Sequence, residues 1–199
     1  MDSSKVYVFG RDSVPQSFRL EAGQALSLTL AVLPGTDVRH RLEVELAGPG
    51  AELDLAGLYL CTGAERVDLR VTVRHLAGGC VSRQLFKGIA GGTSEVLFDG
   101  LIYVARGAQK TQAGQECHSL LLSDGARTES RPQLEIYADD VQCSHGATTG
   151  RLDPDELFYL RSRGIPEAEA RHLQMQAFLA PVARRLPDAL SEELYASLP

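Results

Sequence analysis

The chain has 199 residues, 44% of them hydrophobic, and its 20 basic and 26 acidic side chains give a formal net charge of −6. A chain of this length buries enough surface to fold without a metal or a disulfide, so any bound metal would serve function. The acidic balance, with no block of basic residues, argues against nucleic acid or a membrane surface as partner.

The beginning of the chain carries no targeting or membrane signal. Its first ten residues lack a basic segment followed by an apolar run, so no secretory signal is predicted. The longest apolar stretch, residues 25–33, is about half the length that crosses a bilayer. We therefore expect a cytoplasmic protein that does not span a membrane.

Apolar and polar residues alternate from about residue 5 to residue 150, as in residues 42–46 and 67–73, which predicts one strand after another. No long helical segment separates these strands, and no fixed sequence period is visible. A sandwich, a barrel and a solenoid of short parallel strands all remain open. The strands are punctuated by glycines, which we interpret as turn residues: Gly48, Gly50, Gly57, Gly63, Gly78, Gly79, Gly88, Gly91, Gly92, Gly100, Gly107, Gly114 and Gly125.

The pattern changes to helical at Asp153, which can cap a helix that has Pro154 at its first position. This helix is expected to end at Gly164, and a second, amphipathic helix then begins near residue 166. Pro181 is expected to kink or end that helix, and a third helix covers residues 188–198. The sequence thus predicts an all-β body over residues 1–152 and a small helical appendage over residues 153–199.

The four cysteines, Cys61, Cys80, Cys117 and Cys143, are far apart and form no C-x-x-C pair. This spacing excludes a zinc ribbon and a thioredoxin-type redox motif, and we interpret all four as reduced thiols. Cys61 and Cys80 stand beside apolar strand residues, so we expect both to be buried as small hydrophobic side chains.

The residues 131–165 resemble the core signature of the SufB/SufD family of iron–sulfur cluster assembly proteins; they read RPQLEIYADDVQCSHGATTGRLDPDELFYLRSRGI. Shorter motifs of the same family precede them in the same order: SRQLFKG at 82–88, GLIYV at 100–104, QKT at 109–111 and LLLS at 120–123. The resemblance covers residues 50–199 well and the part before them loosely. The C-S-H-G sequence at 143–146 is similar to the SufD-like branch, because SufB-like chains carry glutamates beside the histidine.

The resemblance implies a right-handed parallel β-helix followed by a C-terminal helical tail. It also implies a non-catalytic scaffold subunit that pairs with a SufB-like subunit, while a SufC-like ATPase docks on the tail and hydrolyses ATP. The sequence itself has no phosphate-binding G-x-x-x-x-G-K-[ST] motif. Family members commonly have a helical region before the β-helix, so we expect this sequence to be a truncated or minimal member. Its exposed ends would allow two copies to pair as a homodimer in isolation.

Cys143 and His145 are two residues apart on a predicted strand, so their side chains leave the same face about 7 Å apart and can reach one metal ion. Tetrahedral iron or zinc needs about four ligands, so the others must come from elsewhere. The resemblance implies that both residues face the SufB-like partner and receive a nascent cluster transiently, without a stably bound cofactor. The alternative is a buried thiol beside a structural histidine.

The resemblance also suggests roles for Cys117 and for the first predicted helix. SufB-like chains carry an important cysteine at about the place of Cys117, so this thiol is either an additional group for cluster or sulfur handling or an incidental cysteine. The first predicted helix concentrates aromatic and arginine residues, which are frequent in binding hot spots. Contact with the ATPase is therefore expected for Phe158, Tyr159, Arg161 and Arg163, whereas Leu157 and Leu160 are expected to pack on their own domain.

Two functions of other classes compete with the assembly scaffold. A carbohydrate-binding or carbohydrate-cleaving β-helix would use paired carboxylates, for which Asp139 and Asp140 are the candidates. Neighbouring residues on a strand point to opposite faces, so we interpret these two aspartates as turn formers or hydrogen-bond acceptors. The second alternative is a purely structural dimerisation module.

Overall fold

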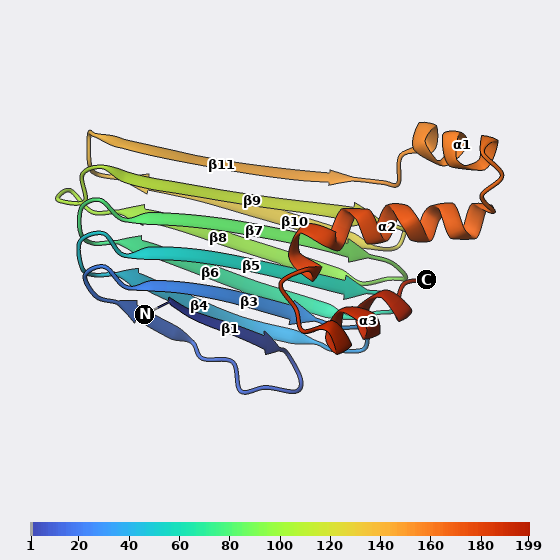
Figure 1. Ribbon diagram of the computed structural model, residues 1–199, viewed down its shortest axis with the longest axis horizontal. Coiled ribbons are helices and arrows are strands. Elements are labelled where there is room, and N and C mark those ends of the chain that lie inside the picture. Colours follow the sequence, from blue (N-terminus) through green and yellow to red (C-terminus); the bar gives the residue numbers. More distant parts are fainter. Residues whose placement is uncertain (1) are drawn as a thin grey trace.

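The structure, a computed structural model, describes residues 2–199 as strands followed by three helices (Figure 1). The strands are β1 (Asp2–Val8), β2 (Ser17–Leu20), β3 (Ala25–Val32), β4 (Val38–Leu46), β5 (Glu52–Cys61), β6 (Arg66–His75), β7 (Val81–Ala90), β8 (Glu95–Val104), β9 (Thr111–Leu121), β10 (Arg127–Ile136) and β11 (Val141–Gly150). The helices are α1 (Pro154–Ser162), α2 (Glu167–Ala183) and α3 (Asp188–Ala196).

Two parallel sheets face each other, and the chain crosses from one to the other after every strand. The odd-numbered strands form a six-stranded sheet in the order β1-β3-β5-β7-β9-β11, and the even-numbered strands form a five-stranded sheet in the order β10-β8-β6-β4-β2. Two successive strands thus make one turn of a solenoid of about five turns. The expected parallel β-helix with a helical tail is confirmed, and the sandwich and the barrel are excluded.

The turns of the solenoid differ in length, which hides its period in the sequence. Along one row of the six-stranded sheet, Ala25 pairs with Glu52, and Val81, Gln112 and Gln142 follow in the same register. The step in residue number changes from each of these positions to the next. The register is kept because the extra residues lie in the turns between strands. Structural repetition therefore exists without a fixed sequence repeat.

Residues that point into the solenoid stack directly on the equivalent residues of the next turn. In the early turns the stacks are leucines, as at Leu28 and Leu55, which pair in register and are both fully buried. Burying a leucine side chain contributes roughly 1.5–3 kcal/mol, and each stack adds one such residue per turn. The predicted burial of Cys61 and Cys80 in this interior is confirmed, since both are 0% exposed.

Four of the glycines interpreted as turn residues, Gly57, Gly88, Gly100 and Gly114, lie inside strands, so that part of the prediction is wrong. Large inward side chains explain three of them. A Cβ on Gly88 would lie 1.9 Å from Tyr59 Cζ, a Cβ on Gly57 would lie 2.4 Å from the Phe86 ring, and a Cβ on Gly100 would lie 2.4 Å from the Gln115 side chain. These glycines give space to a bulky neighbour, not freedom to a turn.

The helices begin as the sequence predicts. The Asp153 carboxylate accepts hydrogen bonds from the backbone N–H groups of Asp155 (2.8 Å) and Glu156 (3.3 Å) and so caps α1, which has Pro154 at its first position. Gly164 follows α1 with φ +87°, the left-handed conformation that ends many helices. Among residues 2–199, no helix is long and apolar enough to cross a membrane.

Helix α2 lies on the outer face of the six-stranded sheet and covers β5 and β7 (Figure 1). Its buried residues Met175, Leu179 and Val182 join one hydrophobic cluster with outward-facing strand residues such as Leu60 and Ile89. Pro181 lies in the last turn of α2, two residues before the helix ends at Ala183. Beyond that end, Arg185 pairs with Asp54 and also donates to Ser27 Oγ (3.1 Å), which joins the tail to β5 and β3.

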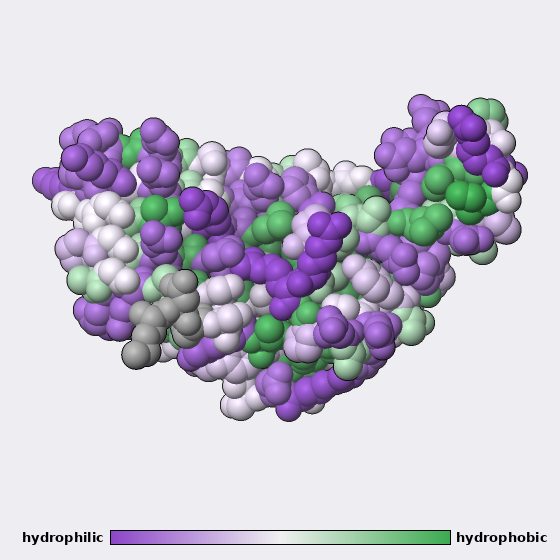
Figure 2. All heavy atoms as spheres, in the orientation of Figure 1, coloured by the Kyte–Doolittle hydropathy of each residue, from purple (hydrophilic) through white to green (hydrophobic). Residues whose placement is uncertain are grey.

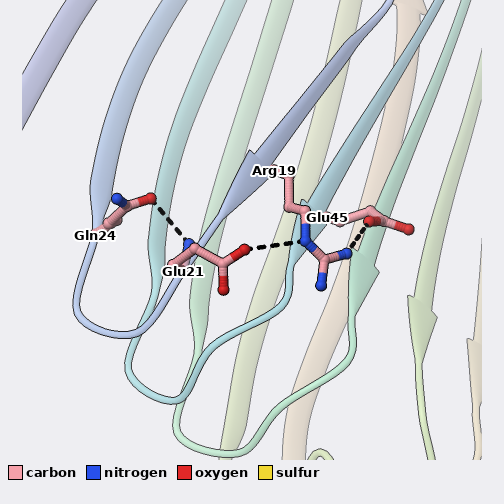
Figure 3. A network of polar contacts seen from close by, with 4 residues as sticks. All are labelled: Arg19, Glu21, Gln24 and Glu45. Carbon is pink, nitrogen blue, oxygen red and sulfur yellow. Dashed lines mark hydrogen bonds and ion pairs between the residues drawn. The ribbon is translucent and has the colours of Figure 1, made fainter.

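The short edge strand β2 is joined to its neighbours by a surface network (Figure 3). Arg19 donates to Glu45 Oε2 on β4 at 2.6 Å and to Glu21 Oε1 at 3.0 Å, while the Glu21 backbone N–H donates to Gln24 Oε1 at 2.9 Å. The Arg19 and Glu21 side chains are more than half exposed, so each ion pair contributes at most about 1 kcal/mol. Their combined effect is to fix the turn from β2 to β3.

We expect Gly88→Ala to destabilise the fold by about 1–3 kcal/mol, because the new methyl group displaces the Tyr59 ring. That ring lies across Gly88, and its hydroxyl hydrogen-bonds with Ser119 Oγ at 2.6 Å, so the displacement also threatens this bond. Urea unfolding measures the difference. Gly107→Ala is the control, since no atom lies within 4 Å of a Cβ at that position; equal stability of the two variants would contradict this account of the packing.

Candidate functional site

The last turn of the solenoid leaves its interior open on one side. Among the described residues, β11 pairs only with β9 and β10 pairs only with β8, so each is the final strand of its sheet. No further turn covers their inward side chains, and Ile136 at the end of β10 is 39% exposed. Tyr137, which follows it, is 55% exposed and packs against Tyr103 with 5.6 Å between ring centroids. This open end is a surface of exposed strand edge and uncovered side chains.

Cys143 and His145 lie on the inward face of β11, at this open end. In the register with β9, Cys143 is opposite Ala113 and His145 is opposite Gln115, and both of these partners are buried residues of the solenoid interior. Cys143 is half-buried against a small apolar cluster that includes Val141, whereas His145 is exposed. The two side chains therefore share one face, as their spacing predicts.

Cys143 is partly buried at the edge strand. Partial burial raises the pKa of its thiol, so the proton must leave before the sulfur can bind a metal. An open hollow of about 380 Å³ lies against Cys143, between the beginnings of β7, β9 and β11, and Arg83 and Gln112 also line it. Most of these lining residues, Arg83 and Gln112 among them, are on the outward face of the sheet, so the hollow borders the strand at Cys143 from the side opposite to its thiol.

As a metal site, the pair of Cys143 and His145 is incomplete. A soft thiolate and an imidazole are suitable ligands for iron or zinc, but they are two ligands of the about four that a tetrahedral ion needs. Within residues 2–199, no group of three or more histidine, cysteine or carboxylate side chains is placed to hold a metal ion. The role of the pair as cluster ligands stays a prediction.

Cys117 lies inside the solenoid, one strand behind the edge. It is 1% exposed on the inward face of β9, and its register partner on β11 is Ala147. Ser130 Oγ, on the opposite sheet, donates a hydrogen bond to Cys117 Sγ at 3.0 Å. Burial raises the pKa of this thiol, so it is protonated at neutral pH. Its proposed part in sulfur or cluster handling stays a prediction.

Helix α1 projects beyond the ends of the strands and buries none of its residues 154–162 (Figure 1). Phe158 is 74% exposed and Tyr159 is 57% exposed. The Arg163 guanidinium lies 5.3 Å from the centre of the Tyr159 ring, and Arg161 forms an exposed ion pair with Glu167 at 3.3 Å. Figure 2 shows hydrophobic residues at the surface of this helical end. The four residues expected to bind a partner are all on the outside.

One glutamine of α2 joins α1 to the rest of the tail. Gln174 Nε2 donates to the Asp153 carbonyl at 3.0 Å and to Glu156 Oε2 at 3.2 Å. Leu157 and Leu160 are half-buried, which agrees with their expected packing on their own domain. Helix α1 is therefore anchored at its beginning and along one side, while its other side is open.

The sequence analysis missed a set of buried polar residues behind the open end. Gln84 and Gln115 are 2% and 1% exposed, and Gln115 Nε2 donates to Gln84 Oε1 at 2.9 Å. His75 Nε2 and Ser82 Oγ are 2.9 Å apart, and burial lowers the pKa of His75 to about 4, which keeps this imidazole neutral. The alternation along each strand could have identified the two glutamines from the sequence. Gln84 and Gln115 occupy the same alternate positions as the buried residues of their strands.

Asp139 and Asp140 lie in the bend between β10 and β11 and are both exposed. The Lys110 N–H donates to the Asp140 carbonyl at 2.6 Å, and the Asp140 N–H donates to Gln109 Oε1 at 2.9 Å. The assumption that the two aspartates are neighbours on a strand is therefore wrong, because the chain turns there between the sheets. Their alternative interpretation as turn formers is confirmed.

Comparison with known proteins gives a family match over most of the chain. Residues 11–178 match the family described as "SUF system FeS cluster assembly, SufBD core domain". This match begins well before residue 50 and so includes the part of the chain where the sequence motifs were sparse. It favours iron–sulfur cluster assembly over the carbohydrate alternative.

Several curated proteins are similar over the same region. The chain is 40% identical to "Iron-sulfur cluster assembly protein SufD" of Escherichia coli over 168 residues, which cover 84% of this chain and 40% of the relative. It is 37% identical to "Protein ABCI7, chloroplastic" of Arabidopsis thaliana over 173 residues, or 85% of this chain and 36% of the relative. The SufD protein of Bacillus subtilis is 36% identical over 158 residues, 79% of this chain and 36% of that relative. The chain thus spans about two fifths of the length of the curated relatives it matches.

Proposed function

Since the chain belongs to the SufB/SufD family and to its SufD-like branch, we propose that it is a scaffold subunit of the SUF iron–sulfur cluster assembly machinery. The observation that carries this proposal is the pair of Cys143 and His145 on one face of the open terminal strand. The subunit itself is non-catalytic and cytoplasmic, and the ATP is hydrolysed by a partner.

We infer that a SufB-like subunit binds at the open end of the solenoid. A strand whose edge is unpaired has free backbone N–H and C=O groups, which can pair with a strand of another chain. The edges of β10 and β11 are of this kind among the described residues, and the exposed Ile136 and Tyr137 add apolar area beside them. Without that partner, the same edges would allow the chain to form a homodimer.

The nascent cluster is the cargo of this interface. Cys143 and His145 supply two ligands, and the SufB-like partner supplies the others, so the cluster binds only when both subunits are present. The Cys143 thiol gives up its proton on binding iron, and its partial burial makes this loss unfavourable until the metal ion is close. Such a site holds a cluster transiently and releases it when the subunits move apart.

We expect the double variant Cys143→Ser and His145→Ala to lower cluster formation by at least about tenfold, because even residues that only support metal ligands contribute that much. The test is anaerobic reconstitution of the complex with iron, sulfide and the partner subunits, followed by the visible absorption spectrum. Co-purification with the partners should be unchanged.

Ser144→Ala is the matched control, because Ser144 lies between the two residues but on the opposite face of β11. It should form clusters as the native chain does. Undiminished cluster formation by the double variant would reject the ligand role and favour the purely structural dimerisation module.

We further propose that helix α1 binds the SufC-like ATPase. Phe158, Tyr159 and Arg161 on α1, and Arg163 directly after it, are exposed residues of types that dominate binding hot spots, and none is buried in this chain. An open hollow of about 410 Å³ beside Tyr159, lined also by Asp155, Glu156 and Leu160, can accept side chains of the partner. Movement of the ATPase would then be transmitted through α1 and Gln174 to the tail.

Replacing Arg161 and Arg163 together by alanine should weaken binding of the ATPase by about tenfold or more, since two hot-spot residues contribute at least about 1 kcal/mol each. Affinity is measured by surface plasmon resonance, and far-ultraviolet circular dichroism should be unaltered. Arg184→Ala, at an exposed arginine beyond the end of α2, is the control and should bind normally. If the Arg161/Arg163 double variant binds the ATPase as tightly as the native chain does, α1 is not the binding site.

Cys117 is the remaining candidate, as an additional thiol for cluster or sulfur handling. If it takes part, Cys117→Ser should reduce cluster formation in the reconstituted complex severalfold while the fold stays stable, because serine keeps a polar partner for Ser130. The same absorption assay, with urea unfolding as the stability check, tests it. Unchanged cluster formation would identify Cys117 as a buried structural residue.

A further inference from the structure

A row of inward-facing residues leads from the apolar interior to His145. In register along the six-stranded sheet, the row contains Leu28, Leu55, Gln84, Gln115 and His145. The row begins at the exposed Lys5 of β1, strands β3 and β5 place leucine in it, and strands β7, β9 and β11 place polar side chains there. The change from leucine to glutamine therefore occurs in the turns directly behind the open end.

The side chains of Gln84 and Gln115 are hydrogen-bonded to each other, but each also has a polar atom without a hydrogen-bond partner among residues 2–199. Gln115 Nε2 donates to Gln84 Oε1 at 2.9 Å, and both side chains are buried. Within the described part of the chain, Gln115 Oε1 and Gln84 Nε2 are buried without a hydrogen-bond partner. Buried polar atoms of folded proteins are nearly always paired, so a free acceptor in this position indicates a hydrogen bond that another side-chain conformation of a neighbouring residue completes.

The position of the Gln115 carboxamide is fixed from two sides. Gln84 holds its nitrogen, and Gly100 on the opposite sheet leaves the space that its end occupies, because a Cβ there would lie 2.4 Å from Gln115 Oε1 and 2.5 Å from Nε2. An acceptor that is held in this way is preorganised for a donor that comes from the next turn.

His145 is the next residue of the row and carries such a donor. Adjacent strands are about 4.8 Å apart, so the imidazole and the Gln115 carboxamide project from neighbouring strands toward the same interior. An inward rotamer of this exposed ring directs its N–H toward the side on which the Gln115 carboxamide lies. A histidine that binds a metal through one nitrogen usually donates its other N–H to such an acceptor.

We propose that Gln115 is the positioning residue of His145: Gln115 Oε1 accepts a hydrogen bond from one ring N–H and leaves the other ring nitrogen unprotonated and facing out of the open end. This inference rests on the proposed function of His145 as a ligand. Gln84 acts behind Gln115 by holding its carboxamide in the orientation that this bond requires.

The test is the tautomer of His145, measured on the isolated chain with 15N-labelled histidine at pH 8. The signal is assigned by its disappearance in His145→Gln. In the native chain we expect one tautomer to dominate, and in Gln115→Leu we expect the ratio of the tautomers to change by about two- to tenfold, the effect of one net hydrogen bond. Gln115→Asn, whose carboxamide is shorter, should have the same effect without loss of polarity.

Gln112→Leu is the control, since Gln112 is on the same strand but faces outward, and it should leave the His145 signals unchanged. Leucine at position 115 continues the row of Leu28 and Leu55, so this variant is expected to fold, with circular dichroism as the check. His145 signals that are the same in the native chain, Gln115→Leu and Gln115→Asn would overturn the proposal.

The measurement needs neither cluster nor partner, so it separates the two proposals. A tautomer change together with normal cluster formation by the Cys143/His145 double variant would reject the ligand function but keep the positioning. An unchanged tautomer together with loss of cluster formation in that variant would reject the positioning alone.

Discussion

The whole molecule depends on parallel pairing in register, which places each inward side chain directly on its counterpart in the next turn. This constraint turns a row of leucines such as Leu28 and Leu55 into a continuous apolar stack. It also forces any change in the row to be met by its neighbours, as Gly88 shows by leaving space for Tyr59. The site at the open end follows from the same rule. Cys143 and His145 point inward because they are in register with buried, inward-facing residues of β9.

Local features of the fold could be predicted from the sequence, whereas the arrangement of the strands could not. Alternation identified the strands, and the Asp153 cap gave the start of α1, because both depend on residues close in the chain. The turns of the solenoid contain different numbers of residues, so the sequence shows no fixed period. Periodicity therefore could not distinguish a solenoid from a sandwich or a barrel, and only the family resemblance predicted the solenoid. Glycines inside strands were misinterpreted as turn residues. A glycine such as Gly88 is needed because a large side chain on the adjacent turn, here Tyr59, occupies the space of its missing Cβ.

The candidate site was predicted to a similar degree. The shared face of Cys143 and His145 followed from their two-residue spacing, and the exposure of Phe158 and Tyr159 agrees with a binding helix. Gln115 was missed because a glutamine in a strand is ordinarily a surface residue, and only the register shows that it lies directly behind His145. The contribution of a residue to this site is thus decided by its row, which the sequence does not reveal without the strand bounds.

The change from leucine to glutamine along one row makes the last turns of the solenoid less apolar than the turns of β3 and β5. In a linear stack each turn is held mainly by its neighbours, so the leucine-filled turns stay together while the last turn, with fewer buried apolar contacts, frays at lower cost. Local opening is therefore concentrated where Cys143 and His145 lie. In the role proposed for Cys143 and His145, this would let the last turn move while the rest of the framework stays rigid.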